Sequence, residues 1–437
     1  MNGILIKNVT IITMNKDKEI IENGVVVLKD KKIIDIGDGS LENKYESFFV
    51  IDGNEGILMP GMINCHSHVS MIAFRSLGDD EPDRLKKYIF PLEKRLVDKE
   101  LVYNGARYGI CEMLLSGVTT FCDMYYYEDE VARAANRLGI RAVLGETIVD
   151  FPSPDSKEPY GGIQYCKEFI EKWHKDELIT PAVAPHAPYT NDDAHLIKAH
   201  KLSKKYNVPL IMHVAEMDYE YNKYKQEYNM TPVQYLDNLK ILDKNFIGAH
   251  LILVDDNDLD ILEKRHIGVS HNIGANSKGA KGVAPIVKMY DRGMKVGFGT
   301  DGPMSGNTLD IITQMPLVGK IQKLFNKDRT LLPAKDIVDM ATMGGAKVLN
   351  LEHEIGSIEI GKKADLVILE TESVNMQPIY DYYSTIVYSA NPANVDTVIV
   401  DGKIIVRKKK ILHIDFKNIR KSLLSMKNKI ISTVKEI

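Results

Sequence analysis

The stretch PGMINCHSH (Pro60–His68) is the most informative part of the sequence, because it places two histidines at the end of a short apolar run. Residues i and i+2 of a β-strand point to the same face, so His66 and His68 can both reach one metal ion. An H-x-H pair alone is weak evidence, since neighbouring histidines are more often surface or hydrogen-bonded residues than ligands. Further candidate ligands strengthen it, because each follows another strand-like segment: His186, His213, His250 and Asp301.

Strand-like and helical segments alternate from Ile57 to about Phe325. The strand-like runs are LMPGMINC, VTTFCDM, RAVLGETI, ITPAVAPH, VPLIMHV, FIGAHLI, IGVSHN and KVGFGTD. Eight such strands with helical crossovers predict a closed (β/α)8 TIM-type barrel. Catalytic groups of such barrels come from the C-terminal ends of the strands, and the candidate ligands fall at those positions.

The two ends of the chain have β character without alternating helices. Residues 1–55 contain short strands joined by turns, and β-rich sequence returns within residues 351–437. We therefore predict a small β-sandwich domain built from both termini, with the barrel over residues 56–350. The last segment, residues 416–437, has apolar residues at helical spacing between lysines. It is expected to form an amphipathic helix that docks on the protein rather than on a membrane.

Composition narrows the classes of function. Apolar residues make up 44% of the 437 and charged residues 27%, which is typical of a globular protein. A net charge of −4 argues against nucleic acid or an acidic membrane surface as the main partner. No apolar run is long enough to span a membrane, and the N-terminus does not resemble a signal peptide. Four scattered cysteines indicate reduced thiols in a cytoplasmic protein: Cys65, Cys111, Cys122 and Cys166.

Histidines and a carboxylate at one barrel mouth predict hydrolytic metal chemistry. Three histidines with one carboxylate suit Zn²⁺ or Fe²⁺ and leave room for a water, whose pKa the ion lowers toward neutrality. Glu216 follows His213 in the segment HVAE. A carboxylate beside a metal-bound hydroxide can carry a proton to a ring nitrogen and then to a leaving amine.

The segments PGMINCHSH, HVAE, AH and GTDGPMSGN together resemble the amidohydrolase superfamily, and the resemblance covers essentially the whole chain. By position, it implies four ligands of one divalent metal, Zn²⁺ or alternatively Fe²⁺: His66, His68, His213 and Asp301. It also implies that His250 orients the attacking water and that Asp301 accepts its proton. Several two-metal members carry a modified lysine at the end of strand 4. Here that strand ends in APHAPYT, without a lysine, which favours one metal.

Further segments resemble the branch that deaminates adenine nucleosides altered at the 5′ position: KKYIFPLEKRL, HAPYT and TPVQYLDNL. This resemblance implies that Glu93 binds the ribose hydroxyls, that His186 contacts the nucleoside and that Glu216 protonates N1. The expected reaction is hydrolysis of the adenine amino group by metal-bound hydroxide, giving an inosine-type product and ammonia. The candidate substrates are 5′-deoxyadenosine, 5′-methylthioadenosine, S-adenosylhomocysteine and adenosine.

The chain departs from this branch after the third predicted strand. Relatives acting on S-adenosylhomocysteine place arginines there, whereas here Glu146 stands in that region and DFPSPDSKEPYGGIQY contains no arginine. A carboxylate-bearing substrate is therefore expected to be disfavoured. The small residues of SHNIGANSKGAKG, which keeps Asn272 and Asn276, predict a wider or more mobile pocket edge.

Two alternatives remain. The same metal and glutamate could serve another N-heterocycle, such as guanine, cytosine or a chloro- or amino-triazine. A non-catalytic scaffold is a minor alternative, because all the key positions carry usable side chains. The resemblance also implies a homo-oligomer, either a dimer or a tetramer. The sequence leaves open the roles of His271 and of the cluster Tyr125, Tyr126 and Tyr127.

Overall fold

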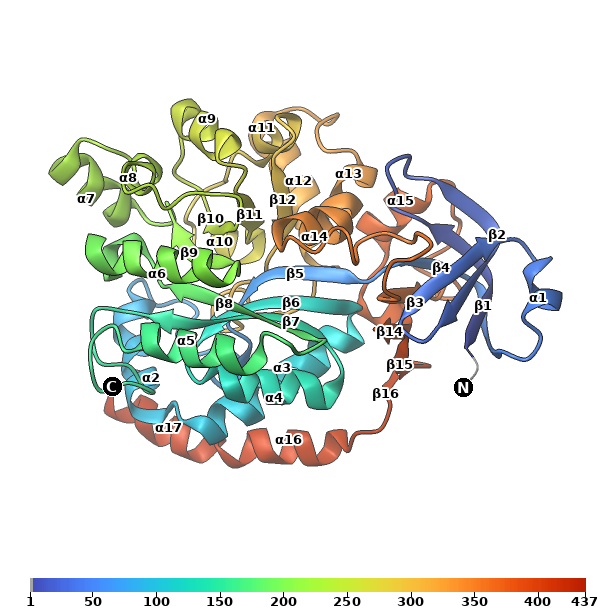
Figure 1. The fold of residues 1–437 in the computed structure, drawn as a ribbon, viewed down its shortest axis with the longest axis horizontal. Coiled ribbons are helices and arrows are strands. Elements are labelled where there is room, and N and C mark those ends of the chain that lie inside the picture. Colours follow the sequence, from blue (N-terminus) through green and yellow to red (C-terminus); the bar gives the residue numbers. More distant parts are fainter. Residues whose placement is uncertain (1–2) are drawn as a thin grey trace. The chain divides into compact units, whose positions relative to one another are not determined.

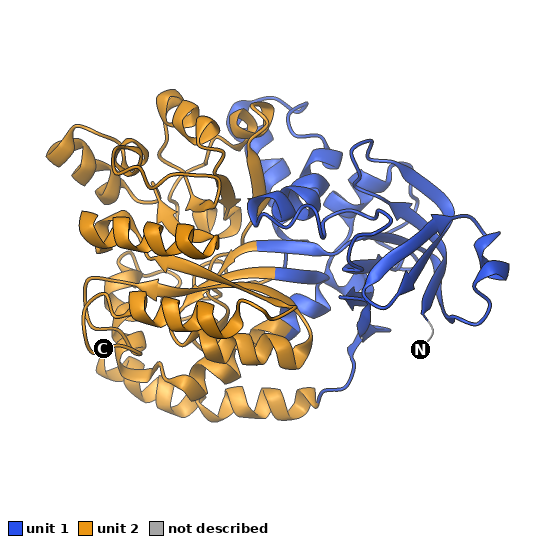
Figure 2. Ribbon diagram, viewed as in Figure 1, with its two compact units in different colours: residues 1–64, 111–120, 310–414 blue, residues 65–110, 121–309, 415–437 orange. Residues whose placement is uncertain are grey.

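The computed structural model describes residues 3–437, and its contacts divide the chain into two compact units (Figure 2). Unit 1 comprises Met1–Asn64, Cys111–Thr120 and Asp310–Ile414. Unit 2 comprises Cys65–Ile110, Phe121–Leu309 and Asp415–Ile437. The domain boundaries expected near residues 55 and 350 stay a prediction.

The barrel sheet has eight strands, each hydrogen-bonded to the next in sequence order (Figure 1). They are β5 (Met62–Ser67), β6 (Val118–Tyr125), β7 (Arg141–Ile148), β8 (Ile179–Pro185), β9 (Leu210–Val214), β10 (Phe246–His250), β11 (Gly268–His271) and β12 (Lys295–Phe298). Every residue of β6 and β7 is buried, as expected of parallel strands covered on both faces. The predicted TIM-type barrel is confirmed.

Backbone hydrogen bonds nearly close the barrel where its last strand meets its first. The amides of Thr300 and Asp301, just beyond β12, both donate to the carbonyl of His66 in β5, each at 3.1 Å. The residues that complete this seam include two of the predicted metal ligands.

Helices connect the barrel strands, and side-chain caps fix where several begin. Asp192 accepts a hydrogen bond from the amide of His195 at 2.9 Å and so caps the helix that begins at Asp193. The connecting helices are α3 (Lys99–Leu115), α4 (Glu128–Leu138), α5 (Gly162–Trp173), α6 (Asp193–Tyr206), α7 (Asp218–Tyr228), α8 (Pro232–Asn238), α9 (Asp256–Lys264), α10 (Ile273–Lys278) and α11 (Ile286–Asp291). Helices α12 (Gln314–Asn326), α13 (Ala334–Asp339) and α14 (Gly345–Val348) follow the last barrel strand.

A second eight-stranded sheet joins the two ends of the chain. Its order is β16 (Lys410–Ile411), β15 (Lys403–Arg407), β14 (Val395–Val400), β13 (Leu366–Leu369), β4 (Phe49–Pro60), β1 (Ile4–Ile12), β2 (Ile20–Lys29) and β3 (Lys32–Gly37). Strand β4 is the junction, since it pairs parallel with β1 and antiparallel with β13. The β domain predicted from both termini is confirmed, and its strands form one continuous sheet.

The run LMPGMINC, expected to be one strand, is divided at Gly61. Strand β4 ends at Pro60 in the second sheet, and β5 begins at Met62 in the barrel sheet. The amide of Gly61 donates to Asp365 O at 2.9 Å, and a Cβ at this position would lie 2.1 Å from Thr119 Oγ1. Only glycine fits so close an approach without a shift of the neighbouring strand.

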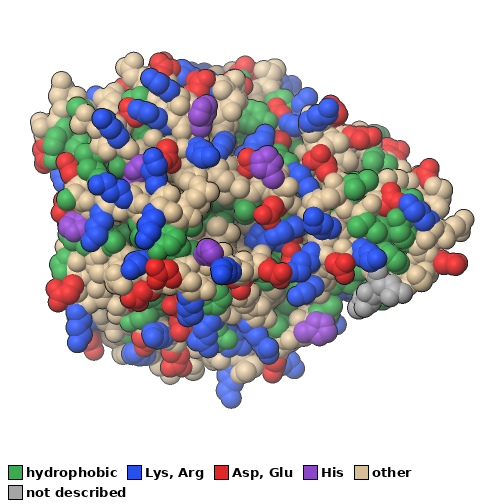
Figure 3. Space-filling model, in the orientation of Figure 1, with side chains coloured by type: hydrophobic (Ala, Val, Ile, Leu, Met, Phe, Trp, Pro, Cys, Tyr) green, Lys and Arg blue, Asp and Glu red, His purple; other side chains and the backbone are tan. Residues whose placement is uncertain are grey.

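The C-terminal segment forms two helices, α16 (Phe416–Ser425) and α17 (Lys427–Glu436), instead of one. Helix α17 packs against α2 (Phe90–Leu96), where Arg95 and Glu436 form an ion pair of 3.2 Å. Between residues 3 and 437 the structure contains no helix both long and apolar enough to cross a membrane. On the face shown in Figure 3, Lys and Arg side chains are interspersed with Asp and Glu.

Candidate active site

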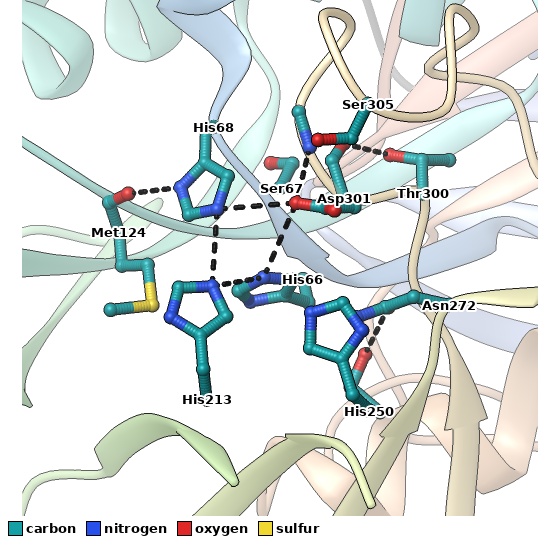
Figure 4. Close-up of polar contacts among 12 residues, drawn as sticks. His66, Ser67, His68, Met124, His213, His250, Asn272, Thr300, Asp301 and Ser305 are labelled. Carbon is teal, nitrogen blue, oxygen red and sulfur yellow. Dashed lines mark hydrogen bonds and ion pairs between the residues drawn. The ribbon is translucent and has the colours of Figure 1, made fainter. Parts of the chain in front are cut away.

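Three histidines and an aspartate from three strand ends converge at the mouth of the barrel (Figure 4). His213 Nε2 lies 3.1 Å from His66 Nε2 and 3.2 Å from His68 Nε2. Asp301 Oδ1 lies 3.3 Å from His68 Nε2 and 3.8 Å from His66 Nε2. The structure thus brings together all four residues predicted as metal ligands.

Backbone carbonyls set the tautomers of two of these rings. His68 Nδ1 lies 2.6 Å from Met124 O, and His213 Nδ1 lies 2.8 Å from His186 O. A carbonyl only accepts hydrogen bonds, so each Nδ1 carries a proton and each Nε2 faces the other candidate ligands. Metal-ligating histidines are commonly oriented in this way, with the second ring nitrogen bound to a carbonyl or a carboxylate.

The donor set fits a divalent metal ion. Two ligands each about 2.1 Å from a tetrahedral ion are about 3.4 Å apart, close to the separations found here. Asp301 adds the negative charge: burial raises the pKa of its carboxyl, but the hydrogen bond with His68 and nearby positive charge hold that pKa well below its usual range. The Asp301 side chain is fixed by the amide of Gly302, which donates to Oδ1 at 2.7 Å.

His250 and Glu216 lie beside this cluster. His250 Nδ1 pairs with Asn276 Oδ1 at 2.8 Å, and His250 Nε2 lies 3.6 Å from Glu216 Oε1. The His250 ring is itself close enough to take part in metal binding. One ligand atom from each of four buried residues lies within 4.8 Å of the others: His66, His213, His250 and Asp301.

A lysine that the sequence analysis did not single out contacts Glu216. The Lys281 ammonium lies against Glu216 Oε1, and both side chains are largely buried. Burial raises the pKa of Glu216, but His250 and the Lys281 ammonium outweigh that effect and lower it to about 2. The only signal in the sequence was the unusual segment SHNIGANSKGAKG, in which Lys281 lies.

A cavity of about 690 Å³ opens above the cluster, and both predicted substrate-binding residues line it. Burial raises the pKa of Glu93 to about 7 and lowers that of His186 to about 4. His186 Nδ1 pairs with Thr190 Oγ1 at 3.1 Å, which orients its ring. Aromatic side chains form much of the remaining wall: Phe90, Tyr125, Tyr126, Tyr189 and Tyr219.

The residues left open by the sequence differ in position. Tyr125 and Tyr126 line the cavity, whereas the Tyr127 hydroxyl donates to Pro154 O at 2.6 Å. His271 is fully buried, and within residues 3–437 neither of its ring nitrogens has a hydrogen-bond partner. It is not among the described residues that line the cavity.

Positively charged side chains line the cavity from segments other than the one that follows the third barrel strand. Glu146 is buried, and its Oε2 accepts from the Glu128 amide at 3.0 Å, while its neighbour Thr147 lines the cavity. Arg84 and Lys281 line the cavity from elsewhere in the chain. The lack of arginines after the third strand therefore does not leave the cavity without cations.

Comparison with known proteins agrees with this geometry. The model of the amidohydrolase family matches residues 57–405. A protein of Thermodesulfovibrio yellowstonii named 5-methylthioadenosine/S-adenosylhomocysteine deaminase is 42% identical over 91% of each chain. The chain belongs to the amidohydrolase family. The predicted hydrolase is confirmed. The buried group of His66, His213, His250 and Asp301, with His68 beside it, can hold the metal ion on which the family depends.

Two further proteins are similar along nearly the full length of this amidohydrolase. One, from Methanosphaera stadtmanae, is named 5'-deoxyadenosine deaminase and is 38% identical over 94% of this chain and 95% of its own. The other is a crystal structure of an adenosine deaminase from Xanthomonas campestris with bound zinc. It superposes with a TM-score of 0.94, at 27% identity, over 98% of each chain.

Proposed function

We propose that this amidohydrolase hydrolyses the amino group of adenine in a 5′-modified adenosine, giving an inosine-type nucleoside and ammonia. The names of the relatives from T. yellowstonii and M. stadtmanae support this substrate class. The observation that carries the reaction is the position of Glu216, 3.6 Å from His250 and inside the cavity. A carboxylate there can serve a ring nitrogen while water adds to the neighbouring carbon.

One divalent metal would be held by the four converging side chains: His66, His68, His213 and Asp301. Zn²⁺ is the proposed ion, since the Xanthomonas structure contains zinc, and Fe²⁺ is the alternative. When bound, such an ion supplies a water activated for attack at neutral pH.

The surrounding side chains hold and move the protons. His250, oriented by Asn276, positions the attacking water through Nε2, and Asp301 accepts a proton from that water. Glu216, which is ionised at the start, takes up the other proton of that water and gives it to N1 of the purine as the water oxygen adds at C6. The proton accepted by Asp301 then passes to the exocyclic nitrogen, the C6–N6 bond breaks, and ammonia leaves. One water is consumed for each ammonia released, so the reaction balances.

The cavity wall binds the nucleoside. Glu93 accepts hydrogen bonds from the two ribose hydroxyls, a pairing suited to a carboxylate because it offers two oxygens. His186 contacts the nucleoside beside the metal cluster, and the aromatic wall gives the purine faces to pack against.

We further propose a homo-oligomer, dimer or tetramer, working in the cytoplasm, where its four buried, unbridged cysteines would stay reduced.

An ultraviolet assay on zinc-loaded protein tests the proposal, with ammonia release as an independent readout. The panel contains adenosine, 5′-deoxyadenosine, methylthioadenosine, S-adenosylhomocysteine, guanine and cytosine. Turnover of the 5′-modified adenosines supports the proposal. Turnover of guanine or cytosine alone moves the chemistry to another heterocycle. Protein that binds no metal and turns over nothing would support the non-catalytic scaffold.

A further inference from the structure

Glu220 follows Glu216 by four residues, near the start of helix α7, and is fully buried. Its carboxylate accepts hydrogen bonds from two consecutive backbone amides. Oε1 accepts from the Ala215 amide at 2.9 Å, and Oε2 accepts from the Glu216 amide at 3.0 Å. Both oxygens are therefore committed to the short turn that follows β9. Hydrogen bonds from amides to a carboxylate are stronger than those to a neutral acceptor.

The turn that Glu220 holds has an uncommon backbone conformation. Ala215 has φ of +52°, in the left-handed region that residues with a Cβ seldom adopt. Such a conformation persists where surrounding contacts over-determine it, and it is often found at functional sites. The Glu220 carboxylate supplies contacts of this kind.

The same turn is tied to the one that carries His250. The Ala215 carbonyl accepts from the amides of Ile252 and Leu253 at 3.0 and 2.9 Å. His250 also has a left-handed backbone, with φ of +77°. The side chains of Glu216 and His250 thus face each other from two left-handed turns that are joined through the main chain.

We propose that Glu220 is a positioning residue, which fixes the main chain at Ala215 and Glu216 so that the Glu216 carboxylate stands beside His250. The inference rests on the proposed function, because it matters only if Glu216 handles protons in the reaction. Without Glu220, two buried amides lose their acceptor and the turn is free to leave the left-handed region. Glu216 would then move relative to the reacting ring.

The test compares Glu220→Ala and Glu220→Gln with Glu227→Ala, which removes an exposed glutamate from the same helix. Glutamine keeps the size but only one acceptor oxygen, so it should retain more activity than alanine. A misplacement of about 1 Å can cost about a hundredfold in rate, so we expect kcat to fall by about 10- to 100-fold in Glu220→Ala. KM and metal content should stay close to the wild-type values, and Glu227→Ala should match the wild type.

A double-mutant cycle separates positioning from a general structural role. If Glu220 acts through Glu216, then Glu220→Gln should lower kcat when Glu216 is present. The same substitution should have no further effect when it is added to Glu216→Gln. An equal loss in both backgrounds, or a fall in metal content that accounts for the loss, overturns the inference. Glu220→Gln carries the test if the alanine variant does not fold.

The two proposals fail in different ways. If Glu216→Gln leaves kcat unchanged, the proton-carrying role of Glu216 falls, and the inference about Glu220 falls with it. If Glu216→Gln lowers kcat strongly while Glu220→Gln keeps full kcat, only the inference about Glu220 is wrong. All measurements use metal-loaded, full-length protein and the nucleoside that the wild type turns over fastest.

Discussion

The ammonium of Lys281 and the carboxylate of Glu216 are in direct contact, although they come from different loops of the barrel. The contact uses Oε1 of Glu216, the same oxygen that lies 3.6 Å from His250. A buried carboxyl without a positive neighbour favours its neutral form. His250 and Lys281 together keep Glu216 ionised and ready to accept a proton.

Replacing Lys281 should change the pH dependence of catalysis. In Lys281→Met the ammonium that lowers the pKa of Glu216 is gone, so that pKa should rise. If the ionised form starts the reaction, the acidic limb of kcat/KM must then move to higher pH. Lys278→Met is the control, since Lys278 pairs with Asp79 and Asn307. If the acidic limb of kcat/KM lies at the same pH in the wild type and in Lys281→Met, the role of ionised Glu216 as proton acceptor would be contradicted.

Glu93 should govern nucleoside affinity without affecting the metal. Hydrogen bonds to a charged group contribute about 1.5–3 kcal/mol, so Glu93→Ala should lower kcat/KM for 5′-modified adenosines by about 10- to 100-fold. Substrates lacking a ribose hydroxyl should lose less from the same substitution. Tyr127→Phe, whose hydroxyl bonds to Pro154 instead, should behave like the wild type. Metal analysis confirms that each variant is loaded, and equal losses for all substrates would argue against ribose binding.

Metal removal should abolish turnover and lower stability together. His213 Nε2 lies 3.1 and 3.2 Å from the Nε2 atoms of His66 and His68, so a cation bound between them stabilises an arrangement that only the folded state has. A ligand present at a thousand times its Kd stabilises the folded state by about 4 kcal/mol. Chelation should lower the melting temperature, and Zn²⁺ should restore both stability and activity. His68→Ala should lose metal, while His353→Ala, at a side chain that is 93% exposed, should keep it.

Gly61 should be sensitive to a single methyl group. Overpacking in a well-packed core costs about 1–3 kcal/mol, so Gly61→Ala should lower the free energy of unfolding by about that amount. Urea denaturation measures the change, with Gly39→Ala as the control because the nearest atom to its added Cβ is a side-chain oxygen at 3.7 Å. An unchanged denaturation midpoint in Gly61→Ala would show that the Thr119 strand can move aside.

Regular alternation made the barrel and the convergence of the candidate metal ligands predictable. The C-terminal ends of parallel strands meet at one edge, so His66, His213 and Asp301 could be brought together from the sequence alone. The position of Lys281 could not be predicted, because it lies in a loop without periodicity. Its contact with Glu216 depends on how the neighbouring segments fold. The hydrogen bonds of Glu220 to backbone amides leave no pattern in the sequence. The break at Gly61 was hidden because both sides of it are apolar and strand-like.

The seam of the barrel has a consequence for how the proposed metal ion would be acquired. His66 belongs to the first barrel strand and Asp301 follows the last, and the Asp301 amide bonds to the His66 carbonyl. A chain still emerging from the ribosome therefore has the early histidines long before it has the carboxylate. The complete set of proposed ligands exists only once the first and last strands have closed the barrel, so metal loading would mark the end of barrel assembly.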